Sequence, residues 1–172
     1  MKFLGVALSV ALLSSSSSTY AASDAEQTFD TLKALAGSWE GPVTTDPQAA
    51  GMQGEMMQVS LRVTSTGNAL LHEMKSEGRP DDPITMLYLD EGRLVLTHYC
   101  DAGNRPRMVG KRSPDGKTIE FDFLDVAGST QHGHMHHAVF TIIDANHHTE
   151  DWTYVLPGDK SVDAHFDLRR AK

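Results

Sequence analysis

Most of the chain alternates between apolar and polar residues with a period of two. The clearest run is 57–64, where Met57, Val59, Leu61 and Val63 alternate with polar residues. This alternation is typical of a strand with one buried face. Similar short runs recur toward the C-terminus, separated by turn signals rich in Gly, Pro, Asn and Asp. The pattern predicts about ten short strands.

One segment near the start has a helical period instead. Ala25, Phe29, Leu32 and Leu35 are spaced by three or four residues, which predicts a helix over 24–36. No second helix is predicted that could connect parallel strands. The expected fold is therefore mainly β, an antiparallel up-and-down β-barrel with one N-terminal helix, because closing a meander into a barrel removes its edge strands.

The N-terminus has the features of a secretory signal peptide. A basic residue at position 2 is followed by an apolar run over 3–13, then by serines and by the small residues Ala21 and Ala22. The run is too short for a membrane anchor. We expect a signal peptide over 1–22, cleavage near Ala21 and Ala22, and a single domain over 23–172 that is periplasmic or secreted.

Charge and cysteine content narrow the classes of partner. The net charge is −8, and an acidic surface repels nucleic acid and anionic lipid, so neither is an expected partner. Cys100 is the only cysteine, so no internal disulfide can form and the fold must rest on its core. The sequence does not indicate an oligomeric state.

The alternation also predicts which polar residues face the barrel interior. His72 lies on the same face as Leu70 and Met74, while His98 and Cys100 continue the face of the preceding strand leucines. Groups of this kind in an apolar cavity can orient a small ligand. The alternative is that both histidines are buried and bonded to neighbouring groups, without a ligand.

The loop after His98 adds polar groups where functional residues often lie. Asn104 and Arg107 follow at this strand end, although Arg107 can equally be a solvated side chain and Asn104 part of a turn. The expected apolar walls are Tyr88, Phe121, Trp152 and Tyr154. The function favoured by these residues is the binding of a small, partly apolar ligand inside the barrel.

A histidine-rich segment suggests a different function. His132, His134 and His136 share one strand face, a spacing that can bind zinc or copper, and the soft thioether of Met135 favours copper. The alternative is an exposed loop without a physiological metal. His147 and the histidine after it are expected to lie in a turn.

Signatures of common enzymes are absent. The chain has no Gly-x-Ser-x-Gly elbow, phosphate-binding glycine loop or His-Glu-x-x-His helix. A nucleophilic pair of Cys100 and His98 is the third hypothesis, but residues two apart on a strand are separated by roughly 7 Å. The sequence leaves catalysis uncertain and favours a non-enzyme.

Two resemblances support a barrel. The segment Gly37-Ser38-Trp39-Glu40-Gly41 resembles the opening of calycin-type barrels, including lipocalins and the nitrobindin-like group. This resemblance implies that Trp39 plugs the barrel floor. Together with the segments 97–108, 115–123 and 133–136, the chain is similar to a family of exported bacterial proteins of unknown function, which implies no activity.

The nitrobindin-like group implies a haem cofactor bound by a histidine on the last strand. The matching position here is His165, within Ala164-His165-Phe166-Asp167-Leu168-Arg169-Arg170. The chain departs from that pattern at Asp167, where a small residue is expected, and the alternation directs His165 outward. Haem ligation therefore remains an alternative to copper or zinc.

Overall fold

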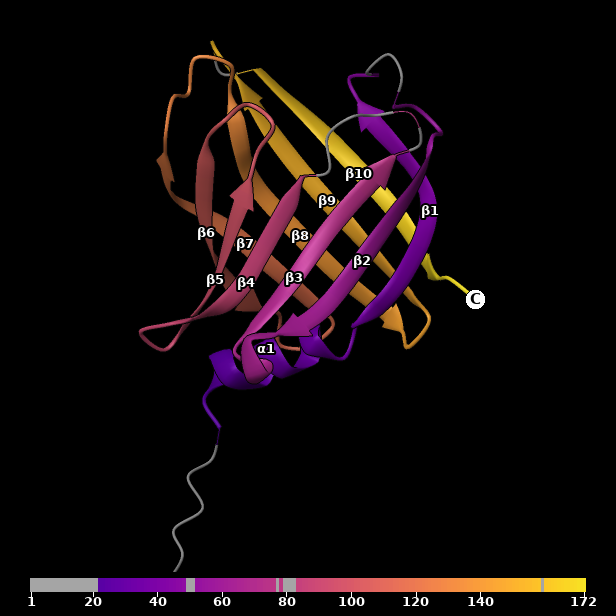
Figure 1. The fold of residues 1–172 in the computed structure, drawn as a ribbon, viewed down its shortest axis with the longest axis vertical. Coiled ribbons are helices and arrows are strands. Elements are labelled where there is room, and N and C mark those ends of the chain that lie inside the picture. Colours follow the sequence, from indigo (N-terminus) through magenta and orange to yellow (C-terminus); the bar gives the residue numbers. More distant parts are fainter. Residues whose placement is uncertain (1–21, 49–51, 77, 79–82, 159) are drawn as a thin grey trace, which may run out of the picture.

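Ten strands close into an antiparallel barrel in the computed structural model, which describes residues 22–48, 52–76, 78, 83–158 and 160–172 (Figure 1). The expected signal peptide, apart from Ala22, lies outside the described residues. The elements are α1 (Asp24–Lys33), β1 (Gly37–Asp46), β2 (Met56–Thr64), the 3-10 turn η1 (Ser65–Gly67), β3 (Ala69–Ser76), β4 (Ile84–Asp90), β5 (Arg93–Tyr99), β6 (Arg105–Arg112), β7 (Thr118–Ala127), β8 (His134–Asp144), β9 (His147–Leu156) and β10 (Lys160–Arg170).

Each strand pairs with its sequence neighbours, and β1 pairs with β10 to close the barrel. At this closing contact Val43 lies opposite Phe166 and Thr45 opposite Ala164. Closure satisfies the backbone groups that an open sheet would leave at its edges. The predicted antiparallel up-and-down barrel with one N-terminal helix is confirmed.

Closure requires a residue without a side chain on β1. A Cβ atom on Gly41 would lie 1.8 Å from the backbone oxygen of Asp167 on β10. No real Cβ approaches a backbone atom so closely, so the two strands can pair here only because position 41 is glycine. The second glycine of the segment 37–41 thus has a steric role.

Helix α1 covers one end of the barrel (Figure 1). A capping box starts it, since the Ser23 hydroxyl accepts from the Glu26 amide and the Glu26 carboxylate accepts from the Ser23 amide. The buried side chains of Phe29 and Leu32 belong to the barrel core. The helix ends at Lys33, three residues before the predicted end, and the chain then turns into β1.

Trp39 fills the barrel at this covered end. Its side chain is buried and its indole Nε1 donates to the backbone oxygen of Leu35 at 2.8 Å. The guanidinium of Arg170 lies 4.2 Å from the ring centroid. The structure therefore places Trp39 where the resemblance to calycin barrels expects a plug.

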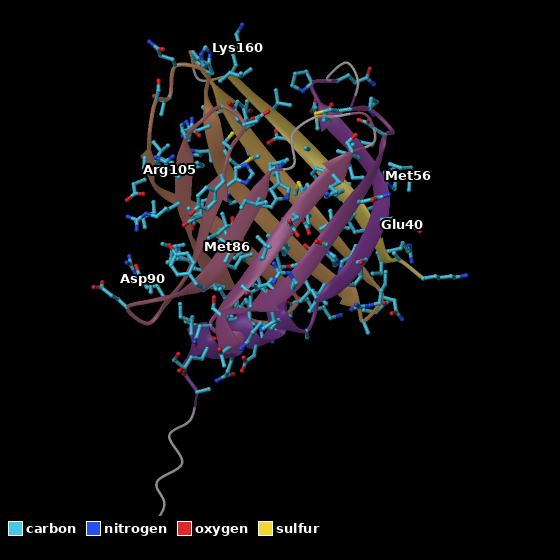
Figure 2. The ribbon with its side chains drawn as sticks, in the orientation of Figure 1. Glu40, Met56, Met86, Asp90, Arg105 and Lys160 are labelled. Carbon is cyan, nitrogen blue, oxygen red and sulfur yellow. The ribbon has the colours of Figure 1, made fainter. Side chains whose placement is uncertain are left out.

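Inner and outer positions alternate as the sequence predicts. Glu40 and Arg105, for example, are exposed and project from opposite sides of the barrel (Figure 2). β1 continues through Asp46, and Val43 and Thr45 are buried on its inner face. One stretch differs from prediction. β9 already begins at His147, so the turn predicted at His147 and His148 is wrong, and the turn precedes them.

Candidate ligand-binding site

A cavity of about 350 Å³ lies at the end of the barrel opposite α1. It is formed where the inner faces of several strands reach this end of the barrel, and its volume is in the range of small-molecule sites. The lining residues are Thr45, Met52, Met57, Met74, Ser76, Pro83, His98, Cys100, Asp101, Met135, Trp152, Tyr154, Val162, Ala164 and Phe166.

The walls of the cavity are mostly apolar. Four methionines, Met52, Met57, Met74 and Met135, contribute flexible thioether side chains. Trp152, Tyr154 and Phe166 add aromatic surface. Methionine adapts its shape to irregular neighbours, so this lining can pack against more than one apolar shape.

His98 is the most deeply buried ionisable group of the cavity lining. Its side chain is only 4% exposed, and its Nδ1 lies 2.9 Å from the Thr85 hydroxyl. Burial, with a smaller contribution from the neighbouring His72, lowers the pKa of His98 to about 4. The imidazole is therefore neutral at pH 7. Its second nitrogen, Nε2, has no hydrogen-bond partner among the described residues.

Cys100, Asp101 and Tyr154 form the outer part of the lining. The Cys100 thiol donates to Asp101 Oδ1 at 3.4 Å, and burial raises the pKa of the thiol. Burial, with the nearby Cys100 and Asp101, raises the pKa of Tyr154 to about 12, and its hydroxyl donates to the backbone oxygen of His132 at 2.9 Å. His98 is bonded to Thr85 and Cys100 to Asp101, so the two do not form a nucleophile–base pair.

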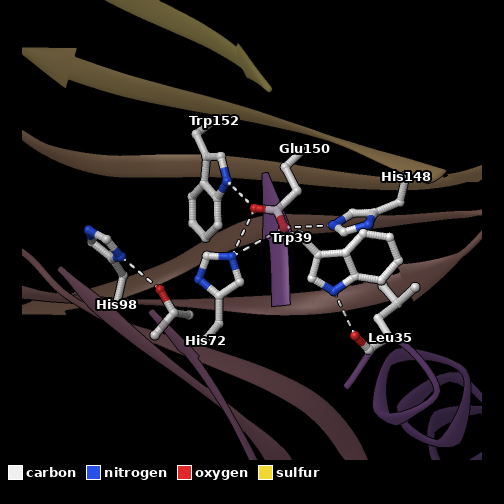
Figure 3. Close-up of polar contacts among 8 residues, drawn as sticks. Leu35, Trp39, His72, His98, His148, Glu150 and Trp152 are labelled. Carbon is white, nitrogen blue, oxygen red and sulfur yellow. Dashed lines mark hydrogen bonds and ion pairs between the residues drawn. The ribbon is translucent and has the colours of Figure 1, made fainter. Parts of the chain in front are cut away.

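A buried carboxylate cluster, consisting of His72, His148, Glu150 and Trp152, lies next to the cavity (Figure 3). The fully buried Glu150 carboxylate accepts from His72 Nε2 at 2.9 Å, from His148 Nε2 at 3.0 Å and from Trp152 Nε1 at 3.0 Å. Burial alone would raise the pKa of Glu150. The Coulombic interaction with His72 and the hydrogen bonds from both histidines outweigh it and hold this pKa well below its usual range.

Trp152 joins the cluster to the cavity. Its indole N–H is held by Glu150, while its ring lines the cavity and lies 5.6 Å from the His98 ring. On the other side of the cluster, the His148 ring packs edge-on against Trp39 at 4.3 Å. The cluster therefore fixes the orientation of an aromatic wall of the cavity and connects it to the plug at the helix-covered end.

The sequence-based interpretation missed Glu150 and His148 as inward-facing residues. They continue the face of Trp152 at intervals of two, so the alternation of β9 contained the signal. The expectation of a turn at His147 and His148 ended the strand too early. Inner positions of a strand are usually apolar, so a carboxylate there was not expected. Glu150 can occupy one because three donors replace the water that its carboxylate loses on burial.

Of the proposed ligand-binding residues, His98, Cys100, Trp152 and Tyr154 line the cavity. His72 is inward-facing as predicted, but it belongs to the buried carboxylate cluster. Phe121 packs in the core against Phe140, away from the cavity.

Three further residues that were predicted to bind the ligand form contacts in the barrel wall or between loops instead. Tyr88 bonds through its hydroxyl to Thr97 at 3.0 Å. Arg107 pairs with Asp125 at 2.8 Å, with both side chains substantially exposed, which agrees with the alternative of a solvated arginine. The buried Asn104 amide donates to the backbone oxygens of Ser129 and Gly133, each at 2.8 Å, and so joins two loops.

The histidine-rich segment brings two of its three proposed ligands together. His136 Nδ1 lies 3.3 Å from His134 Nε2, and the Phe123 ring stacks on His136 at 4.6 Å. In the described part of the chain, the one group of three His, Cys, Asp or Glu with ligand atoms within 4.8 Å is Glu120, Asp122 and His137. His132 therefore does not complete a three-residue group with His134 and His136.

The residue suggested for haem lies on the outer face of the barrel. His165 Nδ1 is 2.6 Å from Asp151 Oδ1, and both side chains are about half exposed. A haem in the lumen needs an inward-facing ligand, so His165 does not fit that role.

Comparisons with known proteins bear on the fold alone. No family model and no curated protein matches the chain. A solved structure from Nostoc punctiforme, a DUF3598 family protein of unknown function, matches 81% of this chain with a TM-score of 0.55 and 9% identity. The match covers 48% of that protein, so the chain spans about half its length.

A second solved structure, from Bacteroides fragilis, matches 80% of this chain and 99% of its own at 11% identity. Its TM-score of 0.18 is too low to carry an argument. Within the described residues, α1 is the one α-helix, and it is not long and apolar enough to cross a membrane.

Proposed function

We propose that the barrel binds a small, partly apolar molecule in the cavity opposite α1. The observation that carries the proposal is a preformed apolar cavity of about 350 Å³, lined by a buried imidazole whose Nε2 has no hydrogen-bond partner in the described part of the chain. A cavity with a few well-placed polar groups is the usual form of a small-molecule site. The resemblance of 37–41 to calycin barrels supports this use of the lumen, and the predicted signal peptide supports a periplasmic or secreted location.

The proposal is tested by filling the cavity. Ala164 lies on β10 opposite Trp152 and lines the cavity, so Ala164→Trp places an indole in the ligand volume. We expect N-phenyl-1-naphthylamine, an uncharged apolar fluorophore, to bind the wild type and to lose at least tenfold in affinity in this variant. Thr44→Trp is the matched control, since it adds the same bulk at an exposed position of β1.

Equal binding to the wild type and Ala164→Trp would place the probe elsewhere and overturn the proposal. Native mass spectrometry of untagged protein from its source then identifies the natural ligand as an added mass. We expect that mass to be absent from Ala164→Trp and present in Thr44→Trp.

A second candidate function is metal binding by His134 and His136. Their facing nitrogens are 3.3 Å apart, which matches two adjacent ligands of a tetrahedral ion at about 2.0–2.1 Å from each. Burial, followed by the effect of His136, lowers the pKa of His134 and favours the unprotonated form that binds a metal. The remaining ligands would come from solvent.

Titration with Zn²⁺ or Cu²⁺ tests this candidate. We expect stoichiometric uptake that is lost in the double variant His134→Ala, His136→Ala. His147→Ala and His165→Ala are controls, because these histidines are already bonded to Asp167 and Asp151. Uptake that is the same in all variants would contradict a site at this pair.

A further inference from the structure

Thr85 determines which nitrogen of His98 carries the proton. Thr85 is buried, and its hydroxyl has one hydrogen-bond partner in the described structure, His98 Nδ1. A buried hydroxyl that accepted from Nδ1–H would leave its own hydrogen without an acceptor, which is costly. The favoured arrangement is that Thr85 donates to Nδ1, so that the proton of the neutral ring is on Nε2.

This arrangement gives the inner end of the cavity a hydrogen-bond donor without a positive charge. The Nε2–H of His98 has no acceptor among the described residues, and the ring is neutral at pH 7 because burial and His72 lower its pKa. The Ser76 hydroxyl, in the same lining, is buried and has no hydrogen-bond partner among the described residues. The Nε2–H of His98 loses its water when an apolar molecule fills the cavity, so a ligand gains by accepting a hydrogen bond from it.

Among the described residues, the lining contains no cation that would stabilise an anion. None of these lining residues is Lys or Arg, and Asp101 places a carboxylate among them. A carboxylate ligand would therefore lose its hydration without an ion-pair partner, which is far more costly than burying an uncharged oxygen. The Nε2–H donor of His98 matches an acceptor without charge, such as a carbonyl, ether or ester oxygen.

We propose that Thr85 fixes His98 as the Nε2–H tautomer, so that the cavity selects uncharged molecules with a hydrogen-bond acceptor and rejects their carboxylate counterparts. This inference rests on the proposed function and names the class of ligand. In it, His98 contacts the ligand and Thr85 is a positioning residue that acts through His98.

The tautomer can be measured without a ligand. Imidazole ¹⁵N shifts distinguish a protonated ring nitrogen from an unprotonated one, and His98→Gln identifies the His98 signals by their loss. We expect Nε2 to be protonated in the wild type and the two tautomers to mix in Thr85→Val. A wild-type ring protonated on Nδ1 would overturn the inference and leave the proposed cavity binding intact.

Ligand selection is measured with three probes of nearly equal shape, namely 2-acetylnaphthalene, 2-isopropenylnaphthalene and 2-naphthoate. At pH 7 we expect the ketone to bind roughly 3- to 10-fold more tightly than the hydrocarbon, because one neutral hydrogen bond is gained. We expect the carboxylate to bind at least tenfold more weakly than the ketone.

Thr85→Val should bring the ketone-to-hydrocarbon ratio close to one, while the hydrocarbon still binds. Thr97→Val is the matched control, since the Thr97 hydroxyl bonds Tyr88 and is not part of the lining, and it should keep the wild-type ratio. Equal affinity for all three probes would overturn the selection but not the binding. If none of the probes binds the wild type, the proposed function fails as well.

Discussion

At the scale of single residues, Glu150 has the least common environment in the barrel. A fully buried carboxylate is stable only when donors replace its water, and here three nitrogens do so. The His72 and His148 Nδ1 atoms are buried and unpartnered among the described residues. The Glu150 carboxylate therefore has its hydrogen-bond donors, whereas the outer nitrogen of each histidine has no partner among the described residues.

Replacing this carboxylate should strongly destabilise the fold. Glu150→Gln retains the size of the side chain but removes the charge and turns one acceptor into a donor that faces other donors. We expect the free energy of unfolding in urea to fall by roughly 3–5 kcal/mol. Asp151→Asn, which breaks the exposed pair with His165, should cost about 0–1 kcal/mol. Equal losses in the two variants would contradict a special role for the cluster.

His98 makes stability depend on pH. Its folded pKa, about 4, lies below the ordinary histidine value of 6.5, so between these values the unfolded chain binds a proton that the folded chain does not. Stability therefore falls as pH decreases from 6.5 toward 4, by up to roughly 3 kcal/mol. The depressed pKa of Glu150 adds to this loss only once the pH approaches the ordinary range of a carboxyl group.

Urea unfolding between pH 6.5 and 4.5 checks the His98 contribution. The stability of His98→Gln should depend less on pH than that of the wild type across this window. Parallel curves for the two proteins would show that His98 titrates alike in the folded and unfolded chains.

At the scale of elements, the sequence predicts strands well and their ends poorly. Alternation and turn residues place nearly all the strands, and the spacing of Phe29, Leu32 and Leu35 places the helix. Cys100 and His98 were assigned to the interior correctly for the same reason. His148 and Glu150 were missed because polar residues at the start of a strand look like part of a turn. The partner that makes Glu150 an inner residue, His72, is 78 positions away in the sequence, so no local pattern reveals the contact.

The pairing of β1 with β10 should be sensitive to the side chain at position 41. In Gly41→Ala the added methyl group would meet the Asp167 backbone oxygen, which cannot move without disturbing the sheet. We expect a loss of about 3 kcal/mol or more in the free energy of unfolding. Gly92→Ala is the control, because it meets no atom within 4 Å and pays only for its positive φ of 76°, about 1–2 kcal/mol. A smaller loss at Gly41 than at Gly92 would contradict the steric argument.

At the scale of the whole molecule, the barrel has one end filled and one end hollow. Trp39 and α1 fill the first, while the cavity occupies the second. The closed barrel follows from the strand count and the lack of crossover helices. The cavity does not follow, because its volume depends on how the described side chains from seven strands and three loops pack together. The sequence alone therefore places Tyr88, Phe121 and Arg107 in the ligand site, whereas in the structure they lie in the barrel wall or the core.

Ligand binding at the hollow end should stabilise the entire barrel, because the site exists only in the folded state. At a free ligand concentration of about 100 times Kd, stabilisation should reach about 2.7 kcal/mol. For a chain of this size that corresponds to a rise in Tm of roughly 5–10 °C. Differential scanning calorimetry with and without ligand measures the shift. Ala164→Trp should show none, and a shift that persists in this variant would indicate binding outside the cavity.

The methionine lining exposes the site to oxidants. Peroxide that enters the cavity meets four thioethers, and each sulfoxide formed adds a polar, chiral oxygen to an apolar wall. Oxidised walls would bind apolar molecules more weakly while the strands and the buried carboxylate cluster keep the barrel closed. Ligand affinity would then respond to the oxidation of these sulfurs, and methionine sulfoxide reductase would restore it.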